Sequence, residues 1–250
     1  MPARLNHETP QDWLQRARVS VVVPALNEAD NLQHLLPRIP EWVHEVILVD
    51  DHCTDGTVAT ARDLLPSIRV VQNLRPGGKG NALRAGFEAV TGDIIVQIDA
   101  DGSEAPEEIS AFVGALLAGA DYAKGSRFII GGGTSDMTFL RKAGNQLFVL
   151  MVRALFHVHF TDLCYGYNAF WTRVVPQLEL DAEGFEIEAM LNLRAVKAGL
   201  KISEVPSYEA NRVNGVGRLL TFPDGWRVLR TILREKYPER IRPIAHAREI

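Results

Sequence analysis

The first half of the chain alternates short β-branched runs with helical patterns, and this alternation limits the folds that the chain can adopt. Each strand pattern is followed by apolar residues at helical spacing. The predicted strands cover 19–26, 44–51, 68–73 and 93–101, and the predicted helices cover 28–39, 57–65, 79–90 and 105–119. Such alternation indicates right-handed β-α-β units around a mostly parallel sheet, and so an α/β fold.

The second half follows the same pattern less regularly. Strands are predicted over 121–128, 167–173 and 201–207, and helices over 137–156, 183–200 and 220–237, the last with Trp226, Leu229 and Leu233 on one side. The glycine-rich stretch 129–136 predicts a mobile loop. Because no repeat or linker interrupts the pattern, we expect one domain over residues 1–250, with a core at about 19–237 and short extensions at both ends.

Charge disfavours one class of partner and leaves others open. A formal net charge of −4 at pH 7 does not fit a general polyanion binder, so we expect no nucleic-acid partner. From Arg212 onward the chain is basic, with nine Lys and Arg against four Asp and Glu. This end either faces phosphate or a membrane surface or forms a solvated helix face.

Cysteine usage and hydropathy bear on the compartment. Cys53 and Cys164 lie far apart and the first residues lack an apolar signal core, so we expect a cytoplasmic protein. The longest apolar stretch, 147–160, is interrupted by Arg153 and two histidines and is shorter than the roughly 18 to 20 residues of a spanning helix. No transmembrane segment is predicted. The stretch is either a core helix or, with the basic end, a peripheral contact with the inner face of the membrane.

Two of the predicted strands end in paired acids. Asp50 and Asp51 end one, and Asp99 and Asp101 end another; the carboxyl ends of parallel strands share the edge where ligands bind. Asp99 and Asp101 suit a hard divalent cation that holds a diphosphate, or else they cap and form a turn. Asp51 either caps the next helix or accepts hydrogen bonds from a nucleobase or ribose.

Basic residues occur near the same predicted edge. Lys79 lies in RPGGKGNAL, where Gly80 replaces the Ser or Thr of an ATP-binding phosphate loop, so we exclude ATP hydrolysis by that route. Lys79 either binds an anion at a helix start or belongs to a plain turn. Arg127 either binds phosphate in bidentate fashion or forms a surface ion pair, and Arg141 and Lys142 add positive charge to the same edge.

Three further carboxylates are candidates for proton transfer. Asp162 precedes an aromatic turn, and Glu186 and Glu188 stand at a predicted helix start. Each is either a general base, a ligand of an acceptor sugar, or a partner of the helix dipole.

The order of these motifs resembles that of the inverting family 2 glycosyltransferases of the GT-A fold. The resemblance is carried by VVVPALNEADNL, VILVDDHCTDGT, RPGGKGNALRAGF, VQIDADGSEAPEEI, KGSR, DLCYGYNAF and GFEIEAML. It covers about 19–237 and looks closest to the dolichyl- or polyprenyl-phosphate mannose or glucose synthase group. It implies a nucleotide-diphospho-sugar transferase fold, with a mostly parallel central sheet flanked by helices.

The resemblance also implies roles for residues at the first two strand ends. Pro24, Ala25, Asn27 and Glu28 look like the nucleotide-binding segment of the family. Asp51 matches the acid that binds the base or the ribose.

Further roles are implied at the metal and phosphate sites. Asp99, Ala100 and Asp101 match the D-x-D motif, whose two acids hold Mg²⁺ or Mn²⁺ on the donor diphosphate. Arg127 matches an arginine near the donor or acceptor phosphate, and Arg141 is a candidate for a second. Mannose synthases of this group typically carry a Gln where Ser103 stands, so the third metal ligand differs here.

We therefore expect a metal-dependent single displacement that moves a hexose from a nucleotide sugar, of the GDP-mannose or UDP-glucose type, to a polyprenyl phosphate. A phosphate acceptor needs no base, whereas a hydroxyl on a glycan or small molecule would require Asp162 or Glu188. The alternatives from other classes are a non-catalytic nucleotide-sugar-binding protein and a nucleotidyltransferase. The second is disfavoured because PALNEADNL has no glycine or basic residue after the first strand.

Overall fold

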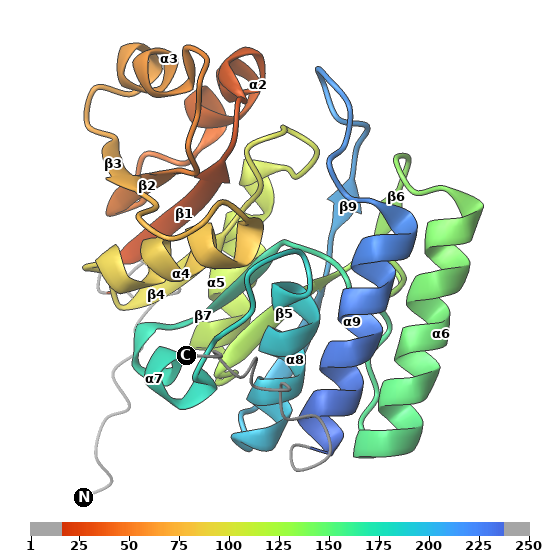
Figure 1. Cartoon of the computed structure of the whole chain (residues 1–250). Helices are drawn as coiled ribbons and strands as arrows, with labels where there is room; N and C mark the ends of the chain where they lie inside the picture. Colours follow the sequence, from red (N-terminus) through yellow and green to blue (C-terminus); the bar gives the residue numbers. More distant parts are fainter. Residues whose placement is uncertain (1–16, 238–250) are drawn as a thin grey trace, which may run out of the picture.

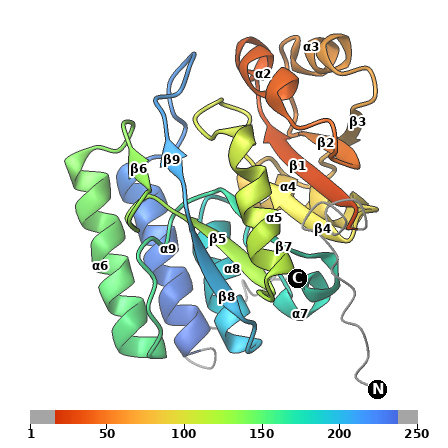
Figure 2. The same cartoon turned by 180° about the vertical axis from the view of Figure 1, so that it is seen from behind.

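One continuous sheet of seven strands runs through the computed structural model, which describes residues 17–237. The strand order is β3-β2-β1-β4-β7-β5-β8, and Figures 1 and 2 show helices on both faces of this sheet. The strands are β1 Val19–Ala25, β2 Glu45–Asp50, β3 Arg69–Gln72, β4 Ile94–Gln97, β5 Tyr122–Ser126, β7 Asn168–Trp171 and β8 Ile202–Pro206. The predicted α/β fold with a mostly parallel sheet is confirmed.

The predicted helices are found in the predicted order. The helices are α2 Ala29–Leu35, α3 Thr57–Leu64, α4 Lys79–Ala89, α5 Ile109–Leu117, α6 Phe139–Phe156, α7 Val175–Leu178, α8 Ile187–Lys197 and α9 Thr221–Lys236, with short 3-10 helices η1 Leu36–Arg38, η2 Pro106–Glu108 and η3 Thr172–Val174. The short helix α7 was not predicted. The helix predicted over 28–39 changes from α to 3-10 geometry after Leu35, because Pro37 lacks the N–H that an α-helix needs there.

The strand directions bring the acidic strand ends together. β7 runs antiparallel to its neighbours β4 and β5, and the other neighbouring pairs of the sheet run parallel. The carboxyl ends of β1, β2 and β4 therefore lie at one edge. The strand predicted over 93–101 ends at Gln97, because Asp101 accepts a hydrogen bond from Ser103 N at 3.0 Å and Gly102 has a φ of 76°, which makes a turn.

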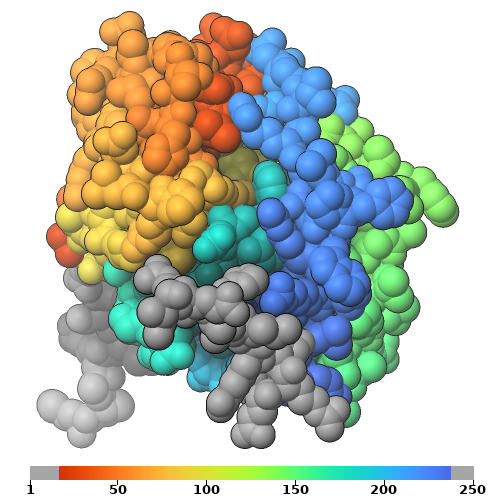
Figure 3. Space-filling model, in the orientation of Figure 1, coloured from red at the N-terminus to blue at the C-terminus, as the bar shows by residue number. Residues whose placement is uncertain are grey.

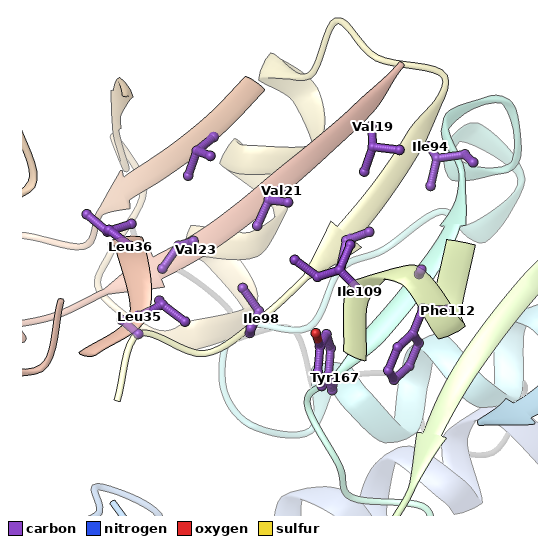
Figure 4. Packing of buried hydrophobic residues seen from close by; sticks show 14 of the residues in the cluster. Val19, Val21, Val23, Leu35, Leu36, Ile94, Ile98, Ile109, Phe112 and Tyr167 are labelled. Atoms are coloured by element: carbon purple, nitrogen blue, oxygen red, sulfur yellow. The ribbon is translucent and has the colours of Figure 1, made fainter. Parts of the chain in front are cut away.

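Each face of the sheet packs on its own apolar cluster. On one face, Val21 lies against α2 and α5, with the rings of Phe112 and Tyr167 stacked 4.3 Å apart (Figure 4). On the other face, α4 and α8 cover a second cluster, in which the rings of Phe87 and Phe170 meet edge to face at 5.2 Å. The central strands of the sheet are thus buried on both sides, which suits the largely apolar sequences of β1, β2 and β4.

Helices α6 and α9 form a further layer beside α8 (Figures 1 and 2). Their shared core consists of Val149, Val152, Phe160, Leu163, Ala189, Leu193, Val228 and Ile232. The predicted stripe of Trp226, Leu229 and Leu233 is not the buried face of α9, since Trp226 is 66% exposed. Among residues 17–237, none of the helices combines the length and apolar character required to cross a bilayer.

The glycine-rich stretch predicted to be a mobile loop contains a short strand. β6, Gly133–Thr134, pairs in parallel with β9, Tyr208–Glu209. A Cβ atom on Gly132 would lie only 2.4 Å from the carbonyl oxygen of Ser126. Close backbone packing therefore explains Gly132, and two residues of the stretch that was predicted as a loop are a strand.

Candidate active site

A cleft of about 900 Å³ opens at the carboxyl ends of β1, β2 and β4 and continues between α6 and α9. Its mouth is the recess between the orange N-terminal part and the blue C-terminal part in Figure 3. The site residues predicted from the sequence line this cleft except Asn27, Lys142, Asp162 and Glu186. Glu186 instead binds the backbone before α8, since its Oε1 accepts from Glu183 N at 3.2 Å and from Gly184 N at 3.1 Å. The predicted residues along the cleft are Pro24, Ala25, Glu28, Asp51, Lys79, Asp99, Ala100, Asp101, Arg127, Arg141 and Glu188.

Asp51, just after β2, is fixed in one orientation. Its side chain accepts hydrogen bonds from Asn73 Nδ2 at 2.7 Å and from Gly78 N at 2.9 Å, and the residue is 4% exposed. Gly78 has a φ of 149°, and a Cβ there would lie 2.4 Å from Glu183 O, so the chain approaches Asp51 this closely only with glycine. Each carboxylate oxygen keeps a lone pair for a ligand.

Asn27 serves the backbone rather than the cleft. Its φ is 53°, and its Oδ1 accepts a hydrogen bond from Thr54 N at 2.7 Å, while its own N–H donates to Cys53 Sγ. The side chain thereby joins the turn after β1 to the turn after β2. The structure thus gives Asn27 a role in shaping the end of the cleft next to β1 and β2.

Asp99 and Asp101 face the cleft from the turn after β4. Ser103 holds Asp101, because its N–H and its hydroxyl both donate to Asp101 Oδ1, at 3.0 and 2.7 Å. Ser103 therefore fixes the orientation of the Asp101 carboxylate. No group of three or more His, Cys, Asp or Glu side chains within residues 17–237 is arranged to hold a metal ion. A cation on this pair would take its remaining ligands from donor phosphates and water.

Lys79, at the first position of α4, lies between two carboxylates. Its Nζ is 2.7 Å from Asp99 Oδ2 and 2.5 Å from Glu188 Oε1. Burial lowers the pKa of Lys79, but the charges of Asp99 and Glu188 outweigh burial and hold that pKa above its ordinary value. Burial raises the pKa of Glu188 against the opposing effect of Lys79. Lys79 is thus a cation in the cleft, and Glu188 is its counter-ion.

Arg127, after β5, is held by acids from two other segments. Asp162, which is fully buried, accepts from Arg127 Nε at 2.7 Å and from Nη2 at 3.0 Å. Glu209 accepts from Nη1 at 3.0 Å, and the ring of Tyr165 lies 4.6 Å from the guanidinium. Burial acts to raise the pKa of Asp162, but Arg127 and then Lys124 outweigh it, so the pKa is below its ordinary value. Asp162 lies behind the arginine, away from the cleft.

Helix α6 brings a basic and a polar residue to the cleft. Arg141 lines it, and its side chain donates a hydrogen bond from Nη2 to Leu219 O at 2.9 Å. Asn145, one turn later and 3% exposed, accepts from Leu163 N and Cys164 N at 3.1 Å. Its Nδ2 has no hydrogen-bond partner among the described residues. Lys142 points elsewhere, with its Nζ 5.6 Å from the ring of Phe128.

Residues 210–219, which we call the flap, connect β9 to α9 and cross the cleft. Arg212 forms ion pairs with Glu28 and with Asp101, and Arg218 Nη2 donates to Leu26 O at 2.6 Å. The flap therefore closes over the end of β1. Glu28 faces the cleft, but Arg212 covers its carboxylate.

Several residues of the site escaped prediction from the sequence. They are Glu104, whose Oε2 accepts from Asp99 N, together with Asn145, Glu209 and Arg212. Asn145 stands four residues after Arg141, a spacing that puts two side chains on one helix face and that could have indicated it. Glu209 and Arg212 lie in segments with no periodic pattern, so no local signal pointed to them.

Comparison with known proteins yields one family. The model of the family described as "Glycosyl transferase family 2" matches residues 20–174. The polyprenol monophosphomannose synthase of Mycolicibacterium smegmatis is 32% identical over 85% of this chain and 84% of its own length. The undecaprenyl-phosphate mannosyltransferase of Micrococcus luteus is 31% identical over 81% of this chain and 87% of its own length. The dolichol-phosphate mannosyltransferase of Pyrococcus furiosus is 31% identical over 81% of this chain, which spans only 59% of that protein.

Solved structures share the arrangement of strands and helices. Glucosyl-3-phosphoglycerate synthase from Mycobacterium tuberculosis, in complex with Mn²⁺, uridine diphosphate and glucosyl-3-phosphoglycerate, superposes with a TM-score of 0.72. It is 25% identical, and the match covers 92% of this chain and 85% of that one. The expected GT-A fold is thereby confirmed. This chain belongs to glycosyl transferase family 2 and is a glycosyltransferase of the GT-A fold.

Proposed function

We propose that the chain transfers a hexose from a nucleotide sugar to a polyprenyl phosphate, with Mg²⁺ or Mn²⁺ held by Asp99 and Asp101. The observation that carries this proposal is the change in character along the single cleft. The end near β1 and β4 is acidic and polar, and the end between α6 and α9 is apolar. Arg127 and Arg141 line the same cleft and supply positive charge to it. An acceptor with an anionic head and an apolar tail matches this sequence of surfaces.

The apolar end of the cleft supports a lipid acceptor. The side chains that line it come from α6 and the residue Met137 before it, from the end of the flap and from α9: Met137, Leu140, Leu147, Phe148, Leu219, Phe222, Trp226, Val228 and Leu229. The names of the relatives, which specify polyprenol, undecaprenyl phosphate and dolichol phosphate, favour the same class of acceptor. They also favour mannose as the hexose.

Asn145 supports a phosphate at the boundary between the two ends. A buried amide donor without a partner costs roughly 1 to 3 kcal/mol, and a ligand oxygen removes that cost. Arg141, one turn earlier on α6, has guanidinium nitrogens beyond the one that binds Leu219 O. Of the two acids that hold Arg127, Glu209 is the more exposed, and we expect an acceptor phosphate to compete with it. These donors together favour an anionic acceptor.

The candidate general bases also favour an anionic acceptor. Glu188 is paired with Lys79, and Asp162 is buried behind Arg127. A phosphate oxygen is already ionised, so it can attack the anomeric carbon in a single displacement without giving a proton to either acid. The roles that we propose are therefore counter-ion of the cleft lysine for Glu188 and positioning of the Arg127 guanidinium for Asp162.

The two aspartates fit a divalent cation in chemical type. Both carboxylates face the cleft, with side chains 27% and 22% exposed, and oxygen ligands suit Mg²⁺ and Mn²⁺. A bound cation would neutralise charge that builds on the departing diphosphate. Lys79 supplies a second positive charge on the same side of the cleft. The Mn²⁺ in the complex of glucosyl-3-phosphoglycerate synthase favours this assignment.

Exposed apolar side chains support peripheral contact with a membrane. Phe139 on α6 is 88% exposed, and Phe222 and Trp226 on α9 are 78% and 66% exposed. Lys142 and Arg227 lie on the same two helices, and their charge would favour anionic headgroups. The other basic residues counted at the C-terminal end include some that lie outside the described residues.

Membrane contact is tested by co-sedimentation with vesicles that contain an anionic lipid. Phe222→Ser should lower the bound fraction several-fold, because it removes a large apolar side chain from the contact. Leu74→Ser is the matched control, since Leu74 is 87% exposed but lies in the loop after β3. Equal losses for both variants would contradict the assignment of the surface to α6 and α9.

The transfer reaction is tested with undecaprenyl phosphate and radiolabelled GDP-mannose or UDP-glucose, with Mg²⁺ or Mn²⁺ and with a chelator. We expect label in the organic phase for one donor, and its loss on chelation. Asn145→Asp keeps the oxygen that accepts from the backbone but replaces the amide donor with an anionic oxygen. It should lower lipid transfer roughly tenfold or more, given about 1.5 to 3 kcal/mol for a hydrogen bond to a charged group.

Gln146→Glu is the control for this charge change. Gln146 is the next residue on α6, lies outside the cleft lining, and donates to Thr161 O at 3.4 Å. Its variant should keep transfer within about twofold of wild type, as expected for a substitution outside the site. Label on a small hydroxyl acceptor, with none on the lipid phosphate, would refute the proposed acceptor and favour a base role for Glu188.

A further inference from the structure

Arg212 occupies the position from which a cation would approach Asp101. Its Nη1 lies 3.3 Å from Asp101 Oδ2, and its Nη2 binds both oxygens of Glu28. The side chain is only 14% exposed. The guanidinium thus joins an acid of the nucleotide end to an acid of the proposed metal pair, two residues that are 73 positions apart in the chain.

The hydrogen bonds of Asp101 leave one oxygen for a cation, and Arg212 holds that oxygen. Oδ1 accepts from Ser103 N and from Ser103 Oγ, which uses both of its lone pairs. Oδ2 is the oxygen paired with Arg212. A divalent cation on Asp101 must therefore compete directly with the guanidinium, and the two positive charges would repel each other at that distance.

The flap itself has other attachments. Asn214 N donates to Asn31 Oδ1 at 2.9 Å, Asn214 Nδ2 donates to Asp30 O at 3.1 Å, and Arg218 binds Leu26 O. None of these bonds involves the carboxylate of Asp101, whose carbonyl oxygen accepts from Val213 N at 3.4 Å. The Arg212 side chain can therefore leave Asp101 while the rest of the flap stays on α2 and the end of β1.

We propose that Arg212 is a built-in counter-cation of Asp101 that keeps divalent-cation affinity low until a donor diphosphate is present. The diphosphate offers the guanidinium new anionic partners, so Asp101 becomes available and cation and donor bind cooperatively. This inference rests on the proposed metal role of Asp99 and Asp101. Lys79, on Asp99, neutralises the other member of the pair in the same way.

The inference predicts a specific change in metal affinity without any catalytic turnover. Binding of Mn²⁺ is measured by the loss of its free-ion electron paramagnetic resonance signal, with and without GDP or UDP. Wild type should bind Mn²⁺ weakly alone and more tightly with the diphosphate. Arg212→Gln should tighten Mn²⁺ binding to the free protein roughly tenfold, the effect of losing one charged competitor, and reduce the gain from diphosphate.

Two variants separate the contact from net charge. Arg218→Gln removes the same charge from the same flap at a guanidinium that binds a carbonyl, and it should leave Mn²⁺ affinity within about twofold, as for a screened surface charge. Arg212→Lys keeps the charge, but one ammonium cannot span Glu28 and Asp101 as a guanidinium does. Arg212→Lys should tighten Mn²⁺ binding by a factor between those of wild type and Arg212→Gln. It also provides a second variant in case Arg212→Gln misfolds, and thermal unfolding shows whether each variant is folded.

Three outcomes of the Mn²⁺ binding measurements would overturn the inference about Arg212. Equal tightening in Arg212→Gln and Arg218→Gln would reduce the effect to net charge and overturn the inference. Unchanged affinity in both Arg212 variants, with Mn²⁺ bound by wild type in the presence of diphosphate, would overturn the inference alone and leave the proposed function standing. No Mn²⁺ binding by any variant with either diphosphate would overturn both the inference and the proposed metal site.

Discussion

Replacing Asp162 by Asn tests whether this buried acid is the main counter-ion of Arg127. Asn keeps the shape of the side chain but removes the charge that accepts from Arg127 at 2.7 and 3.0 Å. Loss of one partner of a buried pair costs about 3 to 5 kcal/mol. Because Glu209 still binds the guanidinium, we expect the lower end, about 3 kcal/mol in the free energy of unfolding, measured by urea denaturation at pH 7.

The pH dependence of the unfolding free energy provides a second test of this prediction. The folded-state pKa of Asp162 is lowered, so its stabilisation is present above the unfolded pKa of about 3.9 and is lost as the pH falls through the folded pKa. The difference in unfolding free energy between wild type and Asp162→Asn should therefore decrease only below about pH 4. Glu209→Gln, at a partner that is 16% exposed, should cost about 1 kcal/mol. A cost for Asp162→Asn no larger than for Glu209→Gln would refute the reasoning.

Three further changes probe packing and buried charge. Gly80→Ala should destabilise by about 2 kcal/mol in thermal unfolding, because its Cβ would lie 2.4 Å from Ala182 O; a neutral effect would show that the backbone relaxes. Gly114→Ala should stabilise by about 0.5 to 1 kcal/mol, since its Cβ meets no heavy atom within 4 Å in α5, and destabilisation would contradict this. Glu104→Gln removes an acid whose pKa is raised by burial and then by Asp99. Ionisation of Glu104 makes wild type less stable as the pH rises from the unfolded pKa, about 4.3, toward the folded value. Urea denaturation should show that the unfolding free energy of Glu104→Gln increases relative to that of wild type between pH 5 and pH 8. The same difference at both pH values would contradict this prediction.

Local sequence patterns were enough to predict most of the fold. Runs such as 19–26 are apolar at every position except Ser20, which suits a strand with helices on both faces, and the helical spacing after each run predicted those helices. The rule for parallel strands then placed Asp51, Asp99 and Asp101 at one edge, where the cleft is found. The sequence did not reveal that 133–134 would pair as a strand with 208–209, because pairing across such a separation leaves no local mark.

Residue type and position in the chain were enough to place Asp51, Asp99, Asp101 and Arg127 at the cleft, but their partners come from the tertiary structure. Asp162 and Glu209 reach Arg127 from 35 and 82 residues away, and Arg212 reaches Glu28 from 184 residues away. The sequence by itself determined the α/β architecture and the acidic edge, since both follow from periodicity and strand direction. Only the folded tertiary structure decided which charges pair, because ion pairing depends on distances of about 3 Å that no spacing along the chain encodes.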